Sequence, residues 1–152
     1  MVNITKCRYK YCRNGGNVNK EDAIKEGSAY FCKSCHKEKT LKHEIEEYYI
    51  INMPTTAIQL LRKVINQLLN DNNYDAEYVL FILKKIHNNK LKINNPFGLG
   101  SYCNEGRNIT EWKTIKTNKE YQTIKNEIIQ SNKKEEIKFT YKKNNKKWTD
   151  LI

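Results

Sequence analysis

Four cysteines near the N-terminus are the residues of this chain whose types and spacing best suit chemistry. Cys7 and Cys12 enclose four residues, and after nineteen further residues Cys32 and Cys35 enclose two. Zinc binds four thiolate or imidazole ligands in a tetrahedron, and two short cysteine loops separated by one hairpin of chain can close around it. The spacing therefore predicts one structural Zn²⁺ on these four cysteines, with His36 as the replacement ligand if one cysteine does not coordinate.

The residues between the two pairs predict how the cysteines are positioned. Gly15 and Gly16 follow the first pair, where tight turns are expected, and residues 23–31 have the pattern of two short strands around a Glu-Gly-Ser turn. The chain becomes helical from Ser34. This order of loop, hairpin, loop and helix over residues 1–40 resembles treble-clef and half-LIM zinc modules. The resemblance implies a small ββα module that the metal holds together.

Two other interpretations of the cysteines are less favoured. Residues 32–36 also spell C-x-x-C-H, the attachment motif of c-type haem, but the second cysteine pair and the absence of an export signal favour zinc. A thioredoxin-like site needs a strand–helix–strand pattern, which does not surround Cys32 and Cys35. Cys103 has no cysteine near it in the sequence, and we expect it to be a small buried apolar residue.

The sequence contains no recognisable catalytic motif. Four protein ligands leave no coordination position for an activated water, so catalysis would need other residues. His43-Glu44 lacks the second histidine of H-E-x-x-H, and His87-Asn88-Asn89 lacks the further His or Asp of a metal-finger nuclease. Phosphate-binding glycine loops and nucleophile elbows are also absent. We therefore expect no enzymatic activity and no small-molecule substrate.

The length of 152 residues suits one compact domain with a small appended module. Apolar residues at helical spacing predict an α-helical body over residues 41–131. Helices are expected over residues 34–49, from Pro54 to Leu69, and over residues 75–87, with the last of these at the centre. A short helix or turn should follow Asn95-Pro96, and a further helix should start at Asn108 and either run on or restart at Thr117.

The C-terminal segment, residues 132–152, has a different pattern. From Glu136, Ile137, Phe139 and Tyr141 alternate with the polar residues Lys138, Thr140 and Lys142, which predicts either a β-hairpin or a basic tail. The expected fold class is therefore mainly α, with a small N-terminal zinc-binding ββα module, a bundle-like helical body and, in the first of these alternatives, a C-terminal β-hairpin.

The net charge of +11 is concentrated at the two ends of the chain. Residues 1–40 carry nine basic and four acidic groups, residues 41–96 seven and six, and residues 97–152 twelve and seven. Basic residues interleaved with aromatic ones suit stacking on bases and pairing with phosphates. The candidate contacts are Arg8, Tyr9, Lys10, Tyr11 and Arg13 near the N-terminus, and Lys142, Lys143, Lys146, Lys147 and Trp148 near the C-terminus. The alternative is a solvated basic surface with tyrosines packed inward.

A short chain in which Lys, Asn and Ile make up 61 of 152 residues resembles the small proteins of phages and mobile elements of low-GC bacteria, zinc-containing anti-CRISPR proteins among them. This resemblance implies a stoichiometric inhibitor that binds a Cas nuclease with its guide RNA and blocks DNA loading or cleavage. The positive charge argues against DNA mimicry, because mimics are acidic. The alternative is a DNA- or RNA-binding zinc-finger accessory protein that acts by phosphate contacts.

No segment of the sequence suits a membrane. The longest apolar run, Tyr78 to Leu83, is far shorter than the ~20 residues that cross a bilayer, and residues 1–6 show no signal-peptide pattern. Clustered cysteines in a reducing compartment also favour metal binding over disulfides. We therefore expect a cytoplasmic protein, in a bacterial host cell if phage-encoded, with no membrane partner.

Overall fold

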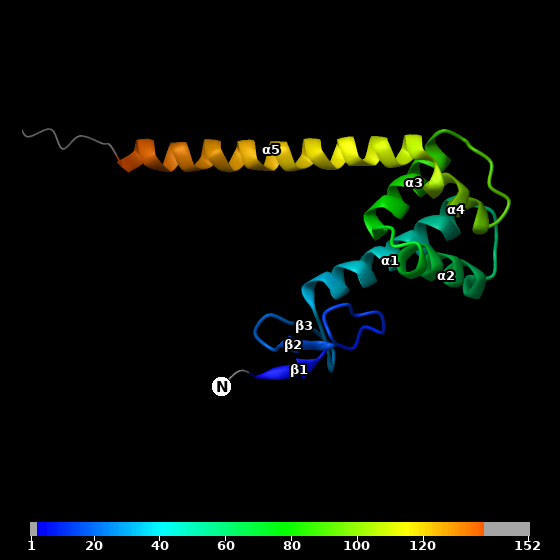
Figure 1. The fold of residues 1–152 in the computed structure, drawn as a ribbon, viewed down its shortest axis with the longest axis horizontal. Helices are drawn as coiled ribbons and strands as arrows, with labels where there is room; N and C mark the ends of the chain where they lie inside the picture. The colour runs from blue at the N-terminus through cyan, green and yellow to red at the C-terminus, as the bar shows by residue number, and fades with distance from the viewer. Residues whose placement is uncertain (1–2, 139–152) are drawn as a thin grey trace, which may run out of the picture. The chain divides into compact units, whose positions relative to one another are not determined.

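The structure, a computed structural model, describes residues 3–138, with side chains as far as residue 131. It is mainly helical with short antiparallel strands at the N-terminal end, which confirms the expected fold class. The elements in chain order are β1 (Ile4–Lys6), β2 (Asn17–Asn19), β3 (Ile24–Glu26), β4 (Ala29–Phe31), α1 (Lys33–Asn52), α2 (Ile58–Asn66), the π-helical turn η1 (Gln67–Asp71), α3 (Ala76–Asn88), α4 (Phe97–Asn104) and α5 (Gly106–Lys138) (Figure 1).

The chain divides into two compact units, residues 1–109 and residues 110–152. The first unit contains the strands, helices α1 to α4 and the first turn of α5. The second contains the rest of α5. The boundary falls inside one helix, so the two units share a continuous backbone.

The N-terminal part of the first unit, residues 3–35, is here called the cysteine module. It consists of two β-hairpins, with Thr5 opposite Val18 in one and Lys25 opposite Tyr30 in the other. Gly27 turns the second hairpin with a φ of +61°, in the left-handed region that favours glycine. The hairpins are joined by a β-bridge between Cys7 and Tyr30. The strand pair predicted before Cys32 is present as β3 and β4, and a second pair, β1 and β2, precedes it.

Helix α1 leaves the cysteine module and enters the helical body, as its sequence predicts. Cys35 in its first turn is buried among the other cysteines, whereas Ile45 and Tyr49, further along, are completely buried against the body. In Figure 1 the hairpins lie at the start of α1, α2 and α3 pack against this helix, and α4 packs against α3. One helix thus belongs to both cores of the first unit.

The next helix begins later than its sequence predicts. Pro54 was expected in its first turn, but α2 starts at Ile58, because Ala57 is still extended, with φ −68° and ψ 129°. Ile58 at the start of α2 is half-buried, and the later apolar residues of the predicted stripe, Leu61, Ile65, Leu68 and Leu69, are buried in the core. They continue through η1, where the amide of Asn72 donates to the carbonyl of Gln67 at 3.1 Å, five residues back rather than four.

Helix α3 is the centre of the helical body, as predicted. More than half of its residues are buried, and it packs against both α1 and α4. The turn after Asn95-Pro96 forms α4, in which Gly98 allows close packing, because a Cβ at this position would lie 3.1 Å from the Cγ2 of Ile93. Tyr78 links α3 to α4, because its hydroxyl group donates a hydrogen bond to the carbonyl of Cys103 at 2.8 Å.

Helix α5 is one continuous helix that starts at Gly106, two residues before the predicted N-terminus. Asn108 is therefore not a cap. It is 4 % exposed, donates to the carbonyl of Tyr102 at 2.9 Å and accepts from the Nζ of Lys85 at 2.8 Å. Helix α5 includes residues 136–138, so no strand begins at Glu136, and the rest of the predicted hairpin or tail lies outside the described residues. Among the described helices, none has the length and apolarity needed to span a membrane.

Candidate metal centre and basic surface

The four cysteines predicted as ligands come together in the cysteine module. The sulfur atoms of Cys7, Cys12, Cys32 and Cys35 all lie within 4.8 Å of one another, and none is in a disulfide. The Sγ atoms of Cys12 and Cys32 are 3.8 Å apart. A tetrahedral site with metal–sulfur bonds of about 2.3 Å has sulfur–sulfur edges of about 3.8 Å. The cluster is therefore positioned to hold one metal ion, as the spacing predicts.

Backbone hydrogen bonds and a helix N-terminus position these sulfurs. The amide of Cys7 donates to the carbonyl of Gly16 at 2.7 Å, which closes the first cysteine loop, and φ at Gly16 is +77°. The amide of Cys32 donates to the sulfur of Cys7 at 3.4 Å. Cys32 is the N-cap residue of α1 and Cys35 lies in its first turn. The positive end of a helix dipole favours thiolates at both positions.

The thiols of the cluster differ in acidity. Desolvation acts to raise the pKa of Cys12, but hydrogen bonds from the Asn14 amide and from the neighbouring cysteine Cys35 lower it to about 7. Burial raises the pKa of both Cys32 and Cys35, and hydrogen bonding with Cys12 raises them further. Like charges this close oppose one another, so four thiolates need a bound cation. The donor set therefore fits a divalent metal that prefers sulfur.

His36 does not belong to the sulfur cluster. Its ring packs edge-on against Phe31, with the centroids 6.2 Å apart, and its amide donates to the carbonyl of Cys32 at 2.9 Å. The metal-ligating group found among the described residues consists of the four cysteines. Three of them are 5–6 % exposed and Cys12 is half-buried, so the cluster opens towards solvent only on the side of Cys12.

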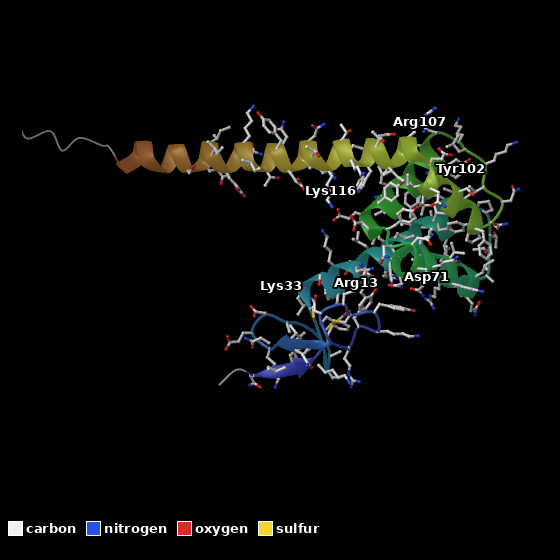
Figure 2. All side chains as sticks on the ribbon, in the orientation of Figure 1. Arg13, Lys33, Asp71, Tyr102, Arg107 and Lys116 are labelled. Carbon is white, nitrogen blue, oxygen red and sulfur yellow. The ribbon has the colours of Figure 1, made fainter. Side chains whose placement is uncertain are left out.

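Three of the residues predicted to contact nucleic acid make contacts within the protein instead. The hydroxyl of Tyr9 donates to Glu38 in α1 at 2.7 Å, and burial together with this bond raises the pKa of Tyr9. The guanidinium of Arg13 donates to the carbonyl of Leu69 in η1 at 3.0 Å. Tyr11 lies under the ammonium group of Lys42, 4.5 Å from its ring centroid. Figure 2 labels Arg13 and, two residues beyond Leu69, Asp71.

Lys42 in α1 is the centre of this contact between the cysteine module and the helical body. Its ammonium group also lies 5.0 Å from the ring centroid of Tyr9 and donates to the Oδ1 of Asn66 in α2 at 3.0 Å. Burial lowers the pKa of Lys42, and the nearby carboxylate of Glu38 partly offsets this. Basic and aromatic residues interleaved in the sequence therefore join two parts of the first unit rather than all facing solvent.

The remaining predicted contacts have different positions. Arg8 and Lys10 are exposed, and Lys10 lies 5.5 Å from the ring centroid of its neighbour Tyr11. The five C-terminal candidates, Lys142, Lys143, Lys146, Lys147 and Trp148, lie outside the described residues.

Sequence reasoning missed a second basic and aromatic group on the cysteine module, here called the Tyr30 patch and made of Arg8, Lys20, Lys25 and Tyr30. The Nζ atoms of Lys20 and Lys25 lie 6.0 Å and 5.9 Å from the ring centroid of Tyr30. The amide of Arg8 donates to the carbonyl of Tyr30 at 2.9 Å. These residues are far apart in the sequence. The signal that could have found the group is the register of the second hairpin, which places Lys25 opposite Tyr30.

Two other residues considered from the sequence have structural roles. Cys103 is completely buried, as predicted, and burial raises its pKa to about 12. The Nδ1 of His87 lies 2.8 Å from the hydroxyl of Tyr48, so this histidine links α3 to α1.

Comparisons of this chain with protein-family models, with curated proteins and with solved structures found no match.

Proposed function

We propose that this chain is a non-enzymatic, zinc-stabilised protein that binds nucleic acid, alone or within a nucleoprotein complex. The observation that carries the proposal is the Tyr30 patch, where the ammonium groups of two lysines lie over an aromatic ring and the exposed Arg8 is bonded to Tyr30 through its backbone. The interior of the same module is occupied by the cysteine cluster. Phosphates pair with such cations, and a base stacks on such a ring. The net charge of +11 supports the same class of partner.

Zinc is the metal proposed for the cysteine cluster. Four thiolates at tetrahedral distances favour zinc or iron, and a single closed Cys₄ site is typical of structural zinc. When bound, Zn²⁺ offsets part of the negative charge of the four thiolates and holds the two hairpins to the start of α1. The cluster is proposed to work in the reducing cytoplasm, where its thiols remain available to the metal.

A salt titration tests the proposal. Binding of a labelled duplex is measured over a range of salt concentrations for the unaltered protein and for Lys20→Glu with Lys25→Glu. Each lost phosphate contact should reduce the slope of log K against log salt by about 0.9. The matched control, Lys90→Glu with Lys92→Glu, makes the same charge change on exposed lysines of the helical body. Equal effects of the two pairs would contradict a specific role of the Tyr30 patch.

The most concrete form of this function is an anti-CRISPR protein of the phage type, which binds a Cas nuclease with its guide RNA and blocks DNA loading or cleavage. The alternative is an accessory protein that binds free DNA or RNA. The Tyr30 patch supports either form, since both present phosphates. Strong, salt-sensitive binding to naked nucleic acid favours the accessory protein, whereas weak binding to naked nucleic acid and tight binding to the complex favours the inhibitor.

A further inference from the structure

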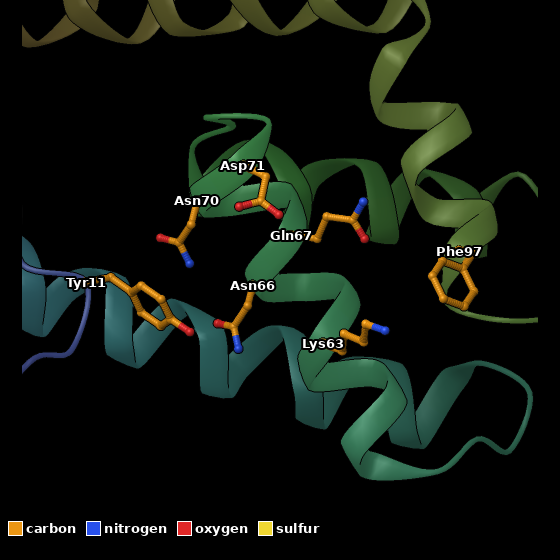
Figure 3. Close-up of a pocket in the computed structure, with 7 residues that line it drawn as sticks. All are labelled: Tyr11, Lys63, Asn66, Gln67, Asn70, Asp71 and Phe97. Atoms are coloured by element: carbon orange, nitrogen blue, oxygen red, sulfur yellow. The ribbon is translucent and has the colours of Figure 1, made fainter.

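A pocket of about 580 Å³ lies where the cysteine module meets α2 and η1. Figure 3 shows Tyr11 at one end and Phe97 at the other, with polar side chains of α2 and η1 between them. The lining residues are Tyr11, Lys63, Asn66, Gln67, Asn70 and Asp71, together with Phe97. The pocket therefore combines two aromatic rings with three amides, a carboxylate and an ammonium group.

The amide of Asn70 is the least satisfied polar group in this pocket. Its Nδ2 is buried and has no hydrogen-bond partner. The terminal torsion of asparagine is broad, so the amide can turn and present either its oxygen or its nitrogen to the open side. Asn70 belongs to η1, and single π-helical turns occur frequently at functional sites. Once turned to the open side, this unpartnered amide can bond to a group from outside the chain.

The wall formed by Tyr11 is held in place. Lys42 lies 4.5 Å from the ring centroid of Tyr11 and donates to the Oδ1 of Asn66, which leaves the Nδ2 of Asn66 as a hydrogen-bond donor. The guanidinium of Arg13 fixes η1 through the carbonyl of Leu69. The aromatic ring and the amides are thus positioned by contacts that exist without a ligand.

We propose that this pocket receives one unpaired base of a single-stranded nucleic acid. The inference rests on the proposed function and names its substrate class. The Watson–Crick edge of an unpaired base carries donors and acceptors together, and the amides with Asp71 offer both. Tyr11 supplies an aromatic surface for stacking, and Lys63 supplies a cation for the attached phosphate. A paired base hides this edge, so duplexes should reach only the Tyr30 patch.

The test compares a single strand of about 10 nucleotides, carrying one 2-aminopurine, with the duplex of the same length. The unaltered protein should bind the single strand about 10-fold more tightly than the duplex, and the 2-aminopurine fluorescence should change on binding. The variants Asn70→Leu and Gln67→Leu should bring this ratio close to one without changing duplex affinity. Gln59→Leu is the matched control, because Gln59 is exposed on α2 and does not line the pocket.

The outcomes separate this inference from the proposed function. If the unaltered protein binds single strand and duplex equally, or if both pocket variants keep the full preference for the single strand, the base pocket is refuted while nucleic-acid binding stands. If the pocket variants lose only the affinity for a protein target, the pocket is a protein contact and the inference is again overturned. If the unaltered protein binds neither nucleic acid, the base pocket is refuted, and if it also fails to bind a Cas nuclease with its guide RNA, the proposed function itself fails.

Discussion

The sulfurs of the metal centre come in two pairs from two short segments, and all four lie within 4.8 Å of one another, so one substitution disrupts the whole cluster. In Cys35→Ser we expect zinc content to fall from one per chain to a small fraction, because three thiolates and an alcohol bind zinc much more weakly. Structural zinc in finger peptides contributes about 10–16 kcal/mol, so the cysteine module should unfold. Elemental analysis and circular dichroism measure the two effects.

Cys103→Ala is the control for this substitution, since Cys103 is free and lies in the helical core. It should retain full zinc content. The helices of the body should persist in Cys35→Ser, because α3 and its neighbours bury their own apolar residues. Zinc content that is unchanged in Cys35→Ser would contradict the ligand assignment, and a complete loss of helicity would show that the first unit unfolds as one.

The thiol of Cys103 predicts a dependence of stability on alkaline pH. Burial raises its folded-state pKa to about 12, above an unfolded value near 8.5. The folded state therefore holds this proton more tightly than the unfolded state. Its contribution is fully present below about pH 8.5 and declines as pH rises towards 12. Chemical denaturation between these pH values should show a shallower loss of stability in Cys103→Ala than in the unaltered protein. Parallel curves would contradict this assignment.

At the scale of elements, the contact between the cysteine module and the helical body depends on Arg13 and Lys42. Arg13→Ala removes the hydrogen bond to Leu69, and Lys42→Met removes the ammonium group shared by Tyr9, Tyr11 and Asn66. Each should destabilise this contact by about 1–2 kcal/mol. Amide exchange in η1 should accelerate while zinc content stays unchanged. Lys10→Ala, an exposed neighbour, should leave exchange unaltered.

The junction of α3, α4 and α5 depends on one buried amide. Asn108→Ala removes the bonds to Tyr102 and Lys85 and leaves the carbonyl of Tyr102 without this donor. Loss of a buried hydrogen-bond partner costs about 1–3 kcal/mol, so the midpoint of thermal unfolding should fall by several degrees. The exposed Asn94→Ala should have little effect. An unchanged midpoint of thermal unfolding in Asn108→Ala would show that these hydrogen bonds do not stabilise the junction.

Sequence patterns predict these elements better than the contacts between them. The cysteine spacing reveals the metal centre because all ligands follow from short loops and one hairpin. Helical periodicity likewise reveals α3. The role of Arg13 was missed, because its partner Leu69 is 56 residues away and is a backbone carbonyl, which no side-chain pattern encodes. The π-helical turn was missed for a similar reason: the apolar spacing through Leu69 also fits an ordinary α-helix.

At the scale of the whole molecule, basic charge is divided between structure and surface. Arg13 and Lys42 are engaged inside the first unit, whereas the Tyr30 patch keeps its cations exposed. The N-terminal excess of five positive charges in residues 1–40 is therefore not all available to a partner. The cations of the Tyr30 patch remain available to the proposed nucleic-acid partner. This surface, rather than the segment that contains Tyr9 and Tyr11, should control the salt dependence of binding.

The last prediction concerns the mode of action. An inhibitor that acts only by binding should reduce the activity of its nucleoprotein target in proportion to the amount added and reach zero near one molecule per target. At nanomolar affinity, binding must supply about 12 kcal/mol, which a few aromatic and basic contacts in one interface can provide. The measurement adds increasing amounts of the protein to a fixed concentration of Cas nuclease that is saturated with guide RNA, and follows DNA cleavage.

The same titration has a matched pair of variants. Lys20→Glu with Lys25→Glu should shift the end point to higher protein concentration, whereas the charge-matched Lys90→Glu with Lys92→Glu should not. Complete inhibition far below one molecule per target, or guide RNA that is chemically altered afterwards, would contradict stoichiometric binding and indicate an enzyme.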